Sequence, residues 1–100
     1  MRGIVIDPGA KPELYRLPDT LQELQRFMGG YAQRCPISNR FAALFYLPQA
    51  GQSLPTRHYN GRLFYGRLCL VGWRNARMTD LPMPLAEELL QKFTHVEVTP

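Results

Sequence analysis

Two long apolar stretches restrict the fold of this chain more than any other feature. Residues 41–47 are apolar at successive positions, and so are residues 67–73 apart from the first, Arg67. Both faces of an extended chain would therefore be hydrophobic in these two stretches. A half-exposed strand alternates apolar and polar residues, whereas two apolar faces are typical of a strand covered on both sides. We therefore expect residues 41–47 to form a central strand and residues 67–73 to form a second strongly apolar strand.

Helix signals occur at two places in the chain. Thr20 and Glu23 have the spacing of a capping box, in which each side chain satisfies a backbone N–H group of the first helical turn. Apolar residues three and seven positions apart would share one face of this helix, and a pair of glycines ends it after residue 28. The second helix is expected over residues 84–93, because proline is favourable at a first helical position.

The remaining segments predict shorter strands and one surface loop. The stretch 54–60 is polar and is expected to be that loop. Pro36 limits its own strand to a sheet edge or a strand end. Over residues 1–100 we predict a single α+β domain, a mainly antiparallel sheet of about five or six strands with two helices on one face. The shorter extended segments are 4–6, 14–17, 31–37, 62–65 and 95–98.

The middle of the chain is strongly basic. Between Glu23 and Asp80 there is no acidic residue, and every basic residue is an arginine. The two flanking segments are weakly acidic, so the formal net charge of +4 understates the basicity of the centre. Unpaired arginine favours anions with planar oxygen pairs, such as phosphate or carboxylate. The eight arginines are Arg26, Arg34, Arg40, Arg57, Arg62, Arg67, Arg74 and Arg77.

We expect part of this set to converge on one surface, around the loop 54–60 and the adjacent strand ends. Arginine beside exposed aromatic residues is typical of surfaces that bind bases, phosphates or partner proteins. The alternative is that the arginines pair with the acids of the flanking segments, which would leave ordinary surface ion pairs. The residues expected to bind an anionic partner are Arg57, His58, Tyr59, Arg62, Arg67, Trp73, Arg74 and Arg77.

The sequence carries no motif typical of an enzyme, and we expect no catalytic residue. His58 is the one histidine in an expected loop, and its neighbours in sequence offer no carboxylate to orient it. A phosphate-binding glycine loop is absent from the sequence. None of the two cysteines and two histidines lies two to four positions from another one, as the ligands of a zinc site usually do. We therefore expect no metal and no cofactor. Cys35 and Cys69 are expected to be reduced, buried thiols of a cytosolic protein.

Several short motifs occur in the order expected of a known family. They are residues 4–9 followed by Lys11-Pro12-Glu13, the first helix running into Gly29-Gly30-Tyr31, Leu54-Pro55, and Gly66 leading to Leu70-Val71-Gly72. In these motifs the chain resembles a family of small phage-borne and gut-bacterial domains, domain of unknown function 3846. The resemblance implies a bacteriophage or mobile-element origin. Small proteins from that source are often counter-defence or host-takeover factors.

Three functions fit these observations. We favour a non-catalytic phage or mobile-element accessory protein, a counter-defence inhibitor that binds a host protein through its arginine and aromatic surface. The alternatives are a protein that sequesters a small nucleotide signal and a module that binds nucleic acid directly. We expect a location in the host cytoplasm and no membrane contact, because no apolar run is long enough for a signal peptide or a membrane span. Edge strands near Pro36 or at residues 95–98 would allow a homodimer.

Overall fold

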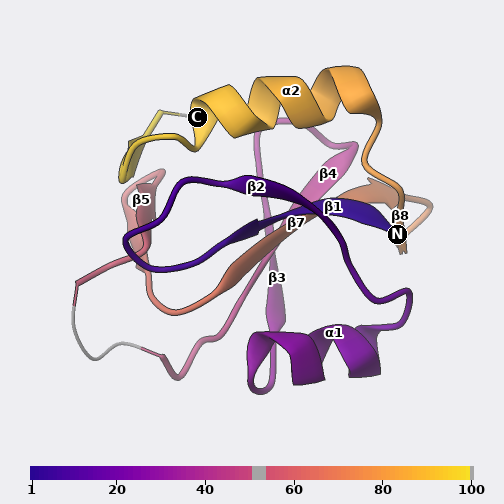
Figure 1. Cartoon of the computed structure of the whole chain (residues 1–100), viewed down its shortest axis with the longest axis horizontal. Coiled ribbons are helices and arrows are strands. Elements are labelled where there is room, and N and C mark those ends of the chain that lie inside the picture. The colour runs from indigo at the N-terminus through magenta and orange to yellow at the C-terminus, as the bar shows by residue number, and fades with distance from the viewer. Residues whose placement is uncertain (51–53, 100) are drawn as a thin grey trace.

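A six-stranded antiparallel sheet forms the centre of the molecule, and one helix lies on each of its faces (Figure 1). The computed structural model describes residues 1–50 and 54–99. The strand order is β2-β1-β7-β4-β3, and β8 pairs with the C-terminal half of β7. The strands of this sheet are β1 (Arg2–Ile6), β2 (Glu13–Arg16), β3 (Gln33–Pro36), β4 (Ala42–Tyr46), β7 (Leu68–Arg74) and β8 (Arg77–Thr79).

A second, smaller sheet lies at the opposite end of the molecule from β8 (Figure 1). Its strand order is β6-β5-β9, with β5 and β6 antiparallel and β5 and β9 parallel. These strands are β5 (Arg57–Tyr59), β6 (Arg62–Phe64) and β9 (Glu97–Val98). The two helices are α1 (Leu21–Met28) and α2 (Met83–Lys92).

The first helix follows its sequence signals closely. The Thr20 side chain accepts a hydrogen bond from the backbone N–H of Glu23 at 3.2 Å, which satisfies one of the free donors of the first turn. Gly29 has a φ of 101°, and its N–H donates to the carbonyl oxygen of Gln25 at 2.9 Å. The predicted glycine stop and the Thr20 cap are therefore confirmed, whereas the Glu23 side chain accepts from the Thr20 hydroxyl at 3.4 Å. The start of α2 also matches, with Pro84 in its first turn.

Alternating residues of the central strands point into two separate cores. Leu68 and Leu70 of β7 belong to the core under α2, whereas Cys69 and Val71 belong to the core under α1. Strand β4 is buried at all five of its positions. The prediction that residues 41–47 form a central strand covered on both sides is confirmed.

The α+β fold class is confirmed, but the arrangement of the helices is not the predicted one. We expected both helices on one face, and they lie on opposite faces, with α2 above the sheet and α1 below it in Figure 1. The physical reason is that β4 and β7 expose apolar side chains on both sides, so each face of the sheet needs its own apolar cover.

The largest error of the sequence prediction concerns the segment 54–60. It was expected to be a polar surface loop, yet Arg57–Tyr59 form strand β5, with the first and last of these residues buried. The predicted strand 95–98 is shorter and belongs to the small sheet, and the strand over 31–37 is limited to Gln33–Pro36. Strand β8 was not predicted. These differences all concern strands of two to four residues.

The two cysteines do not form a disulfide with each other. Cys69 is buried and Cys35 is half-buried, and both are free thiols. Burial raises the pKa of the Cys69 thiol to about 12. Within residues 1–50 and 54–99, neither helix has the length and apolar character needed to cross a bilayer.

Candidate functional site

Arg57 was predicted to lie on a binding surface, but the structure buries it. Its side chain is 2% exposed and has no carboxylate partner within the described residues. Nε, Nη1 and Nη2 donate to the carbonyl oxygens of Phe93, Thr56 and Ala10 at 2.8, 2.5 and 2.8 Å. Burial lowers the pKa of Arg57. Its guanidinium therefore joins the end of α2 to the turn after β1, and it is not available to an external anion.

His58 and Tyr59 are also occupied by contacts within the fold. His58 Nδ1 lies 2.6 Å from Glu97 Oε2, across the parallel pair of β5 and β9. Tyr59 is buried, its hydroxyl accepts a hydrogen bond from the backbone N–H of Ser38 at 2.9 Å, and its ring stacks on Phe93. Tyr59 is thus a core residue, contrary to the prediction that it lies on the binding surface.

Arg67 and Arg62 have intramolecular partners as well. Arg67 Nε donates to Asp7 Oδ1 at 2.7 Å, and its guanidinium lies 4.5 Å from the ring centre of Phe27. The hydrogen bond with Asp7 raises the pKa of Arg67. Arg62 is exposed, but its guanidinium lies 4.5 Å from the ring centre of Tyr46 and donates to the hydroxyl of the same residue. Both side chains stabilise the fold near the small sheet.

The other three predicted residues lie at the opposite end of β7. Trp73 is half-buried at the end of this strand, and Arg74 and Arg77 flank the turn between β7 and β8. Two arginines that the prediction did not select join them there. Arg34 lies 4.6 Å from the ring centre of Trp73, and Arg40 borders a hollow that Trp73 also lines. The arginines therefore converge around Trp73 and not around residues 54–60.

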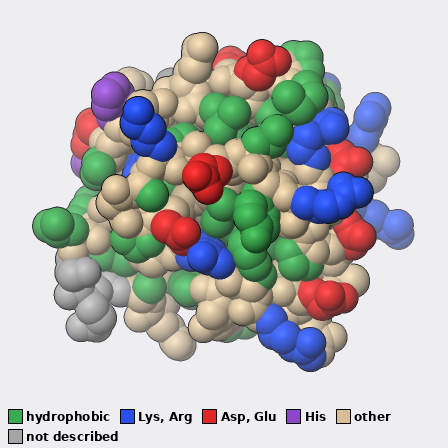
Figure 2. All heavy atoms as spheres, viewed as in Figure 1, with side chains coloured by type: hydrophobic (Ala, Val, Ile, Leu, Met, Phe, Trp, Pro, Cys, Tyr) green, Lys and Arg blue, Asp and Glu red, His purple; other side chains and the backbone are tan. Residues whose placement is uncertain are grey.

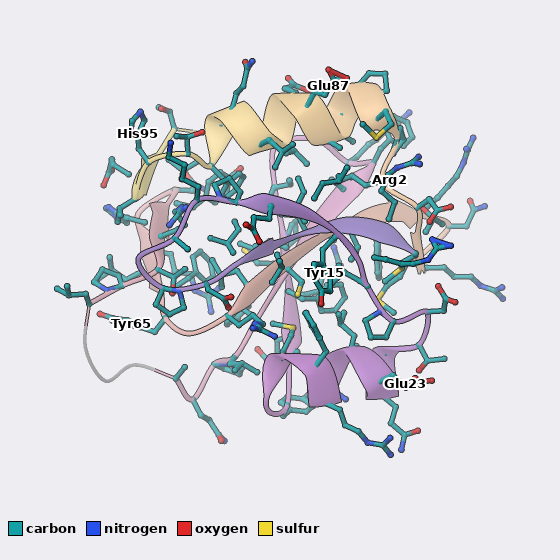
Figure 3. All side chains as sticks on the ribbon, in the orientation of Figure 1. Arg2, Tyr15, Glu23, Tyr65, Glu87 and His95 are labelled. Carbon is teal, nitrogen blue, oxygen red and sulfur yellow. The ribbon has the colours of Figure 1, made fainter. Side chains whose placement is uncertain are left out.

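The arginines are not neutralised internally, which was the alternative left open by the sequence. Among the eight arginines between Glu23 and Asp80, only Arg67 forms an ion pair with a described residue. On the face seen in Figure 2, acidic and basic side chains are interspersed, so that face has no extended patch of one sign. Tyr65 lies at the β5 end of the molecule in Figure 3, away from β8. The unpaired arginines around Trp73 are therefore a local feature.

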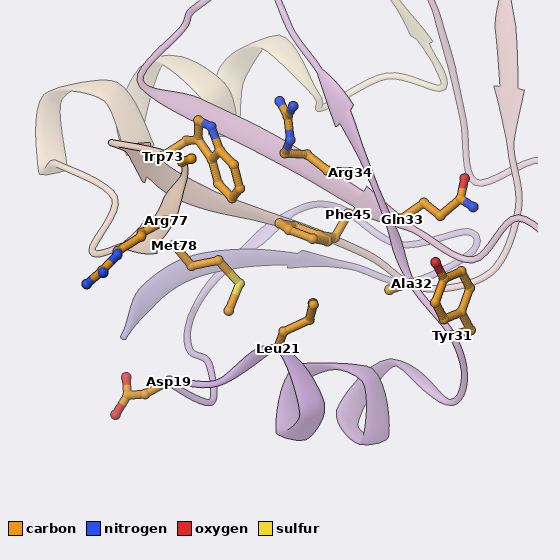
Figure 4. A pocket seen from close by; sticks show the side chains of 11 residues that line it. Asp19, Leu21, Tyr31, Ala32, Gln33, Arg34, Phe45, Trp73, Arg77 and Met78 are labelled. Atoms are coloured by element: carbon orange, nitrogen blue, oxygen red, sulfur yellow. The ribbon is translucent and has the colours of Figure 1, made fainter.

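On the α1 side of the sheet, Arg34, Trp73 and Arg77 border a groove of about 740 Å³ (Figure 4). It forms because α1 has only eight residues and leaves side chains of β3, β7 and β8 uncovered. We call this space the groove. Its main apolar side chains are Leu21, Phe45, Trp73 and Met78. Its main polar side chains are Asp19, Tyr31, Gln33, Arg34 and Arg77.

A smaller hollow of about 400 Å³ lies beside the tip of the β7–β8 hairpin. Phe41 is 46% exposed there, and the Arg40 guanidinium lies 4.9 Å from the centre of its ring. Trp73 borders both this hollow and the groove. We call the hollow and its rim the hairpin face, which consists of Arg40, Phe41, Arg74, Asn75 and Ala76.

The turn of this hairpin has an unusual residue. Asn75 and Ala76 have φ angles of 51° and 58°, the left-handed conformation that glycine adopts most readily. An alanine in this conformation costs about 1 kcal/mol. Arg74 and Arg77 lie directly opposite each other across the turn, so two positive charges are held close together.

Comparison with known proteins adds no family and no structural neighbour. No protein-family model, curated protein or solved structure matches the chain. Within residues 1–50 and 54–99, no three or more histidine, cysteine, aspartate or glutamate side chains lie together as a metal site would require. The function is therefore inferred from the geometry around Trp73.

Proposed function

We propose that this protein acts without catalysis and binds a partner protein through the hairpin face. The partner presents an acidic surface, because the hairpin face carries arginines and no acidic residue. The setting we propose is that of a phage or mobile-element accessory protein that inhibits a host protein in the cytoplasm. That setting rests on the resemblance described above, whereas the binding role rests on the side chains themselves.

One observation carries the proposal: the exposed hairpin tip combines two unfavourable local features. Arg74 and Arg77 repel each other across the turn, and Ala76 occupies a conformation that suits glycine. Neither arginine is relieved by a hydrogen bond or an ion pair with the described residues. Local features that disfavour folding are expected where a binding role requires them.

The neighbouring side chains provide the apolar part of such an interface. Phe41 is a large exposed apolar residue, and Arg40 lies against its ring. Arginine and aromatic residues contribute most of the binding energy in many protein interfaces, and they do so where an apolar centre is shielded from water. An acidic partner would supply the carboxylates that Arg40 and Arg74 lack within the described part of the chain.

A protein partner fits this surface better than nucleic acid. Binding along a nucleic acid backbone requires a row of cations that follows the phosphates, and salt dependence increases with each contact. The hairpin face has only two arginines beside one exposed aromatic ring. Acidic and basic side chains are interspersed on the face shown in Figure 2. This small cationic patch with an apolar centre is typical of a protein interface.

Charge reversal tests the proposal directly. The double variant Arg40→Glu with Arg74→Glu changes the hairpin face from basic to acidic and alters no buried side chain. Arg16→Glu with Arg26→Glu is the matched control, because both arginines are exposed, lie outside the hairpin face, and give the same change in charge. Arg57 is unsuitable for this test, since its reversal would place a carboxylate in the core.

The measurement is affinity capture from nuclease-treated host lysate, followed by titration of the captured protein against each variant. We expect the hairpin-face variant to lose at least about tenfold in affinity, as for the loss of charged interface contacts, and the control to bind like the original chain. Equal binding by both double variants would contradict the proposed role of the hairpin face. Capture that disappears on nuclease treatment would instead indicate nucleic acid binding.

A further inference from the structure

We propose that the groove is a separate binding site for a nucleoside phosphate, a ligand with one planar base and a phosphate monoester. This site goes beyond the protein interface proposed above, because it lies on the α1 side of the sheet and depends on different arginines. Figure 4 shows Arg34 and Trp73 facing each other at one side of the groove, with Phe45 between them and Leu21.

The size and composition of the groove suit a ligand of this kind. Its volume of about 740 Å³ lies within the range of small-molecule sites, which is about 300 to 1,000 Å³. Leu21 and Tyr31 are 46% and 65% exposed at its margin, so a planar ring entering the groove would cover apolar surface that α1 leaves open. The half-buried Trp73 adds a further aromatic ring, and the ring of the buried Phe45 supports it with a centre-to-centre distance of 6.2 Å.

Arg34 is the side chain best placed to bind the phosphate. Its guanidinium carbon lies 4.6 Å from the centre of the Trp73 ring, and this cation–π contact restricts the motion of the Arg34 side chain. Arg34 forms no hydrogen bond or ion pair with a described residue. A guanidinium held in this way can donate two parallel hydrogen bonds to phosphate oxygens.

The charge of the groove favours a phosphate over a carboxylate. Arg77 adds a second exposed cation from β8, on the other side of Trp73 from Arg34 (Figure 4). Asp19 is the one acidic side chain in the lining, and it accepts a hydrogen bond from the amino group of Met1 at 2.7 Å. Two cations without a partner match a phosphate monoester, which carries nearly two negative charges at neutral pH, better than a single carboxylate.

Trp73 makes this proposal simple to test, because it is the only tryptophan in the chain and it lines the groove. Its fluorescence is followed while AMP, GMP, CMP and UMP are added at low salt. At least one nucleotide should bind. The corresponding nucleoside without its phosphate, and inorganic phosphate alone, should each bind at least about tenfold more weakly than that nucleotide. No fluorescence change with any nucleotide up to about 10 mM, where a Kd of about 1 mM would give near saturation, would overturn the proposal.

Variants locate the site and separate it from the hairpin face. Arg34→Ala should weaken nucleotide binding by at least about tenfold, as for the loss of hydrogen bonds to a charged group. Arg26→Ala is the matched control, since this arginine is exposed on α1 and does not line the groove. The single variant Arg40→Glu keeps Arg34 and leaves the pair of Arg74 and Arg77 unchanged, so it should weaken binding of the partner protein and retain the nucleotide within about threefold.

Three results would contradict the nucleotide site. Equal binding by Arg34→Ala and the original chain would remove the phosphate contact. Inorganic phosphate binding as tightly as AMP would show that the apolar part of the groove contributes nothing. A single-stranded oligonucleotide that binds more tightly than any mononucleotide, with a steep decrease as salt rises, would show that the groove belongs to a nucleic acid surface.

Discussion

Two β-hairpins of this protein have turns of the same shape but different composition. The β5–β6 turn is Asn60-Gly61 and the β7–β8 turn is Asn75-Ala76, and all four residues have positive φ angles. Asparagine followed by glycine is the preferred sequence for such a two-residue turn, because glycine adopts this conformation without steric cost. The first hairpin therefore follows the favourable rule, and the second departs from it.

The arginines of the two hairpins also differ in their contacts. In β5–β6, Arg57 is buried against backbone carbonyl groups and Arg62 lies over aromatic rings. In β7–β8, Arg74 and Arg77 are exposed, occupy opposite positions in the strand register, and have no ion-pair partner among the described residues. One residue type thus stabilises the fold at one end of the molecule and remains free for binding at the other.

Removing the buried arginine should have the largest effect on stability. Arg57→Met keeps most of the side-chain volume but leaves the carbonyl oxygens of Phe93, Thr56 and Ala10 without their donors. We expect the free energy of unfolding to fall by about 3 kcal/mol, measured by urea denaturation. Arg74→Met is the matched control in the other hairpin and should change stability by less than about 0.5 kcal/mol. Similar effects of both substitutions would remove the distinction between the two hairpins.

The β5–β6 hairpin shows what the sequence could have predicted and did not. Asn60-Gly61 lies between two short segments, and this dipeptide is the preferred sequence of a two-residue hairpin turn, so the sequence did carry a short-range signal for a hairpin. The prediction treated residues 54–60 as a loop because arginine and histidine suggest exposure. Alternation would have placed Arg57 and Tyr59 on the same side of a strand.

The burial of Arg57 itself could not be predicted from local sequence. Two of its three acceptors are carbonyl groups at Ala10 and Phe93, which lie far from it in the chain and meet only in the folded molecule. The Thr20 cap and glycine stop of α1 depend on neighbours within one turn, and they were predicted correctly. Local signals thus fixed α1, whereas contacts between distant segments decided the role of each arginine.

The candidate site was predicted in part for the same reason. Trp73, Arg74 and Arg77 are close in sequence and follow an apolar strand, which made them recognisable as surface residues. Arg34 reaches Trp73 only because β3 and β7 lie on either side of β4. Neither β3's place in the sheet nor the uncovered groove beside it follows from any local pattern.

Exchanging the turn residues should alter stability in opposite directions. Gly61→Ala places a side chain at a φ of 77°, where an added Cβ meets no other atom within 4 Å, so the cost comes from the backbone alone. We expect the unfolding free energy to fall by about 1 kcal/mol. Ala76→Gly should raise it by up to about 1 kcal/mol, because it relieves the same conformation. A stability loss in Ala76→Gly would show that the β7–β8 turn is not strained.

The smallest expected effect concerns the residue that follows each turn. Arg62 and Arg77 occupy this same position in the two hairpins. Arg77→Glu replaces a repulsion with an attraction to Arg74, so we expect a gain of about 0.5 kcal/mol at low salt. Arg62→Glu removes the contact with Tyr46 and should lower stability by about 1 kcal/mol.

Salt separates the two causes in this last pair. Repulsion between the exposed Arg74 and Arg77 is screened at about 1 M salt, where the Debye length is about 3 Å, so the gain from Arg77→Glu should nearly disappear there. The loss from Arg62→Glu should persist, because it comes partly from contact with an aromatic ring. A gain from Arg77→Glu that does not change with salt would mean that repulsion is not its source. The strained turn would then be the only unfavourable feature of the hairpin tip, and the case for a binding role of Arg77 would depend on the groove alone.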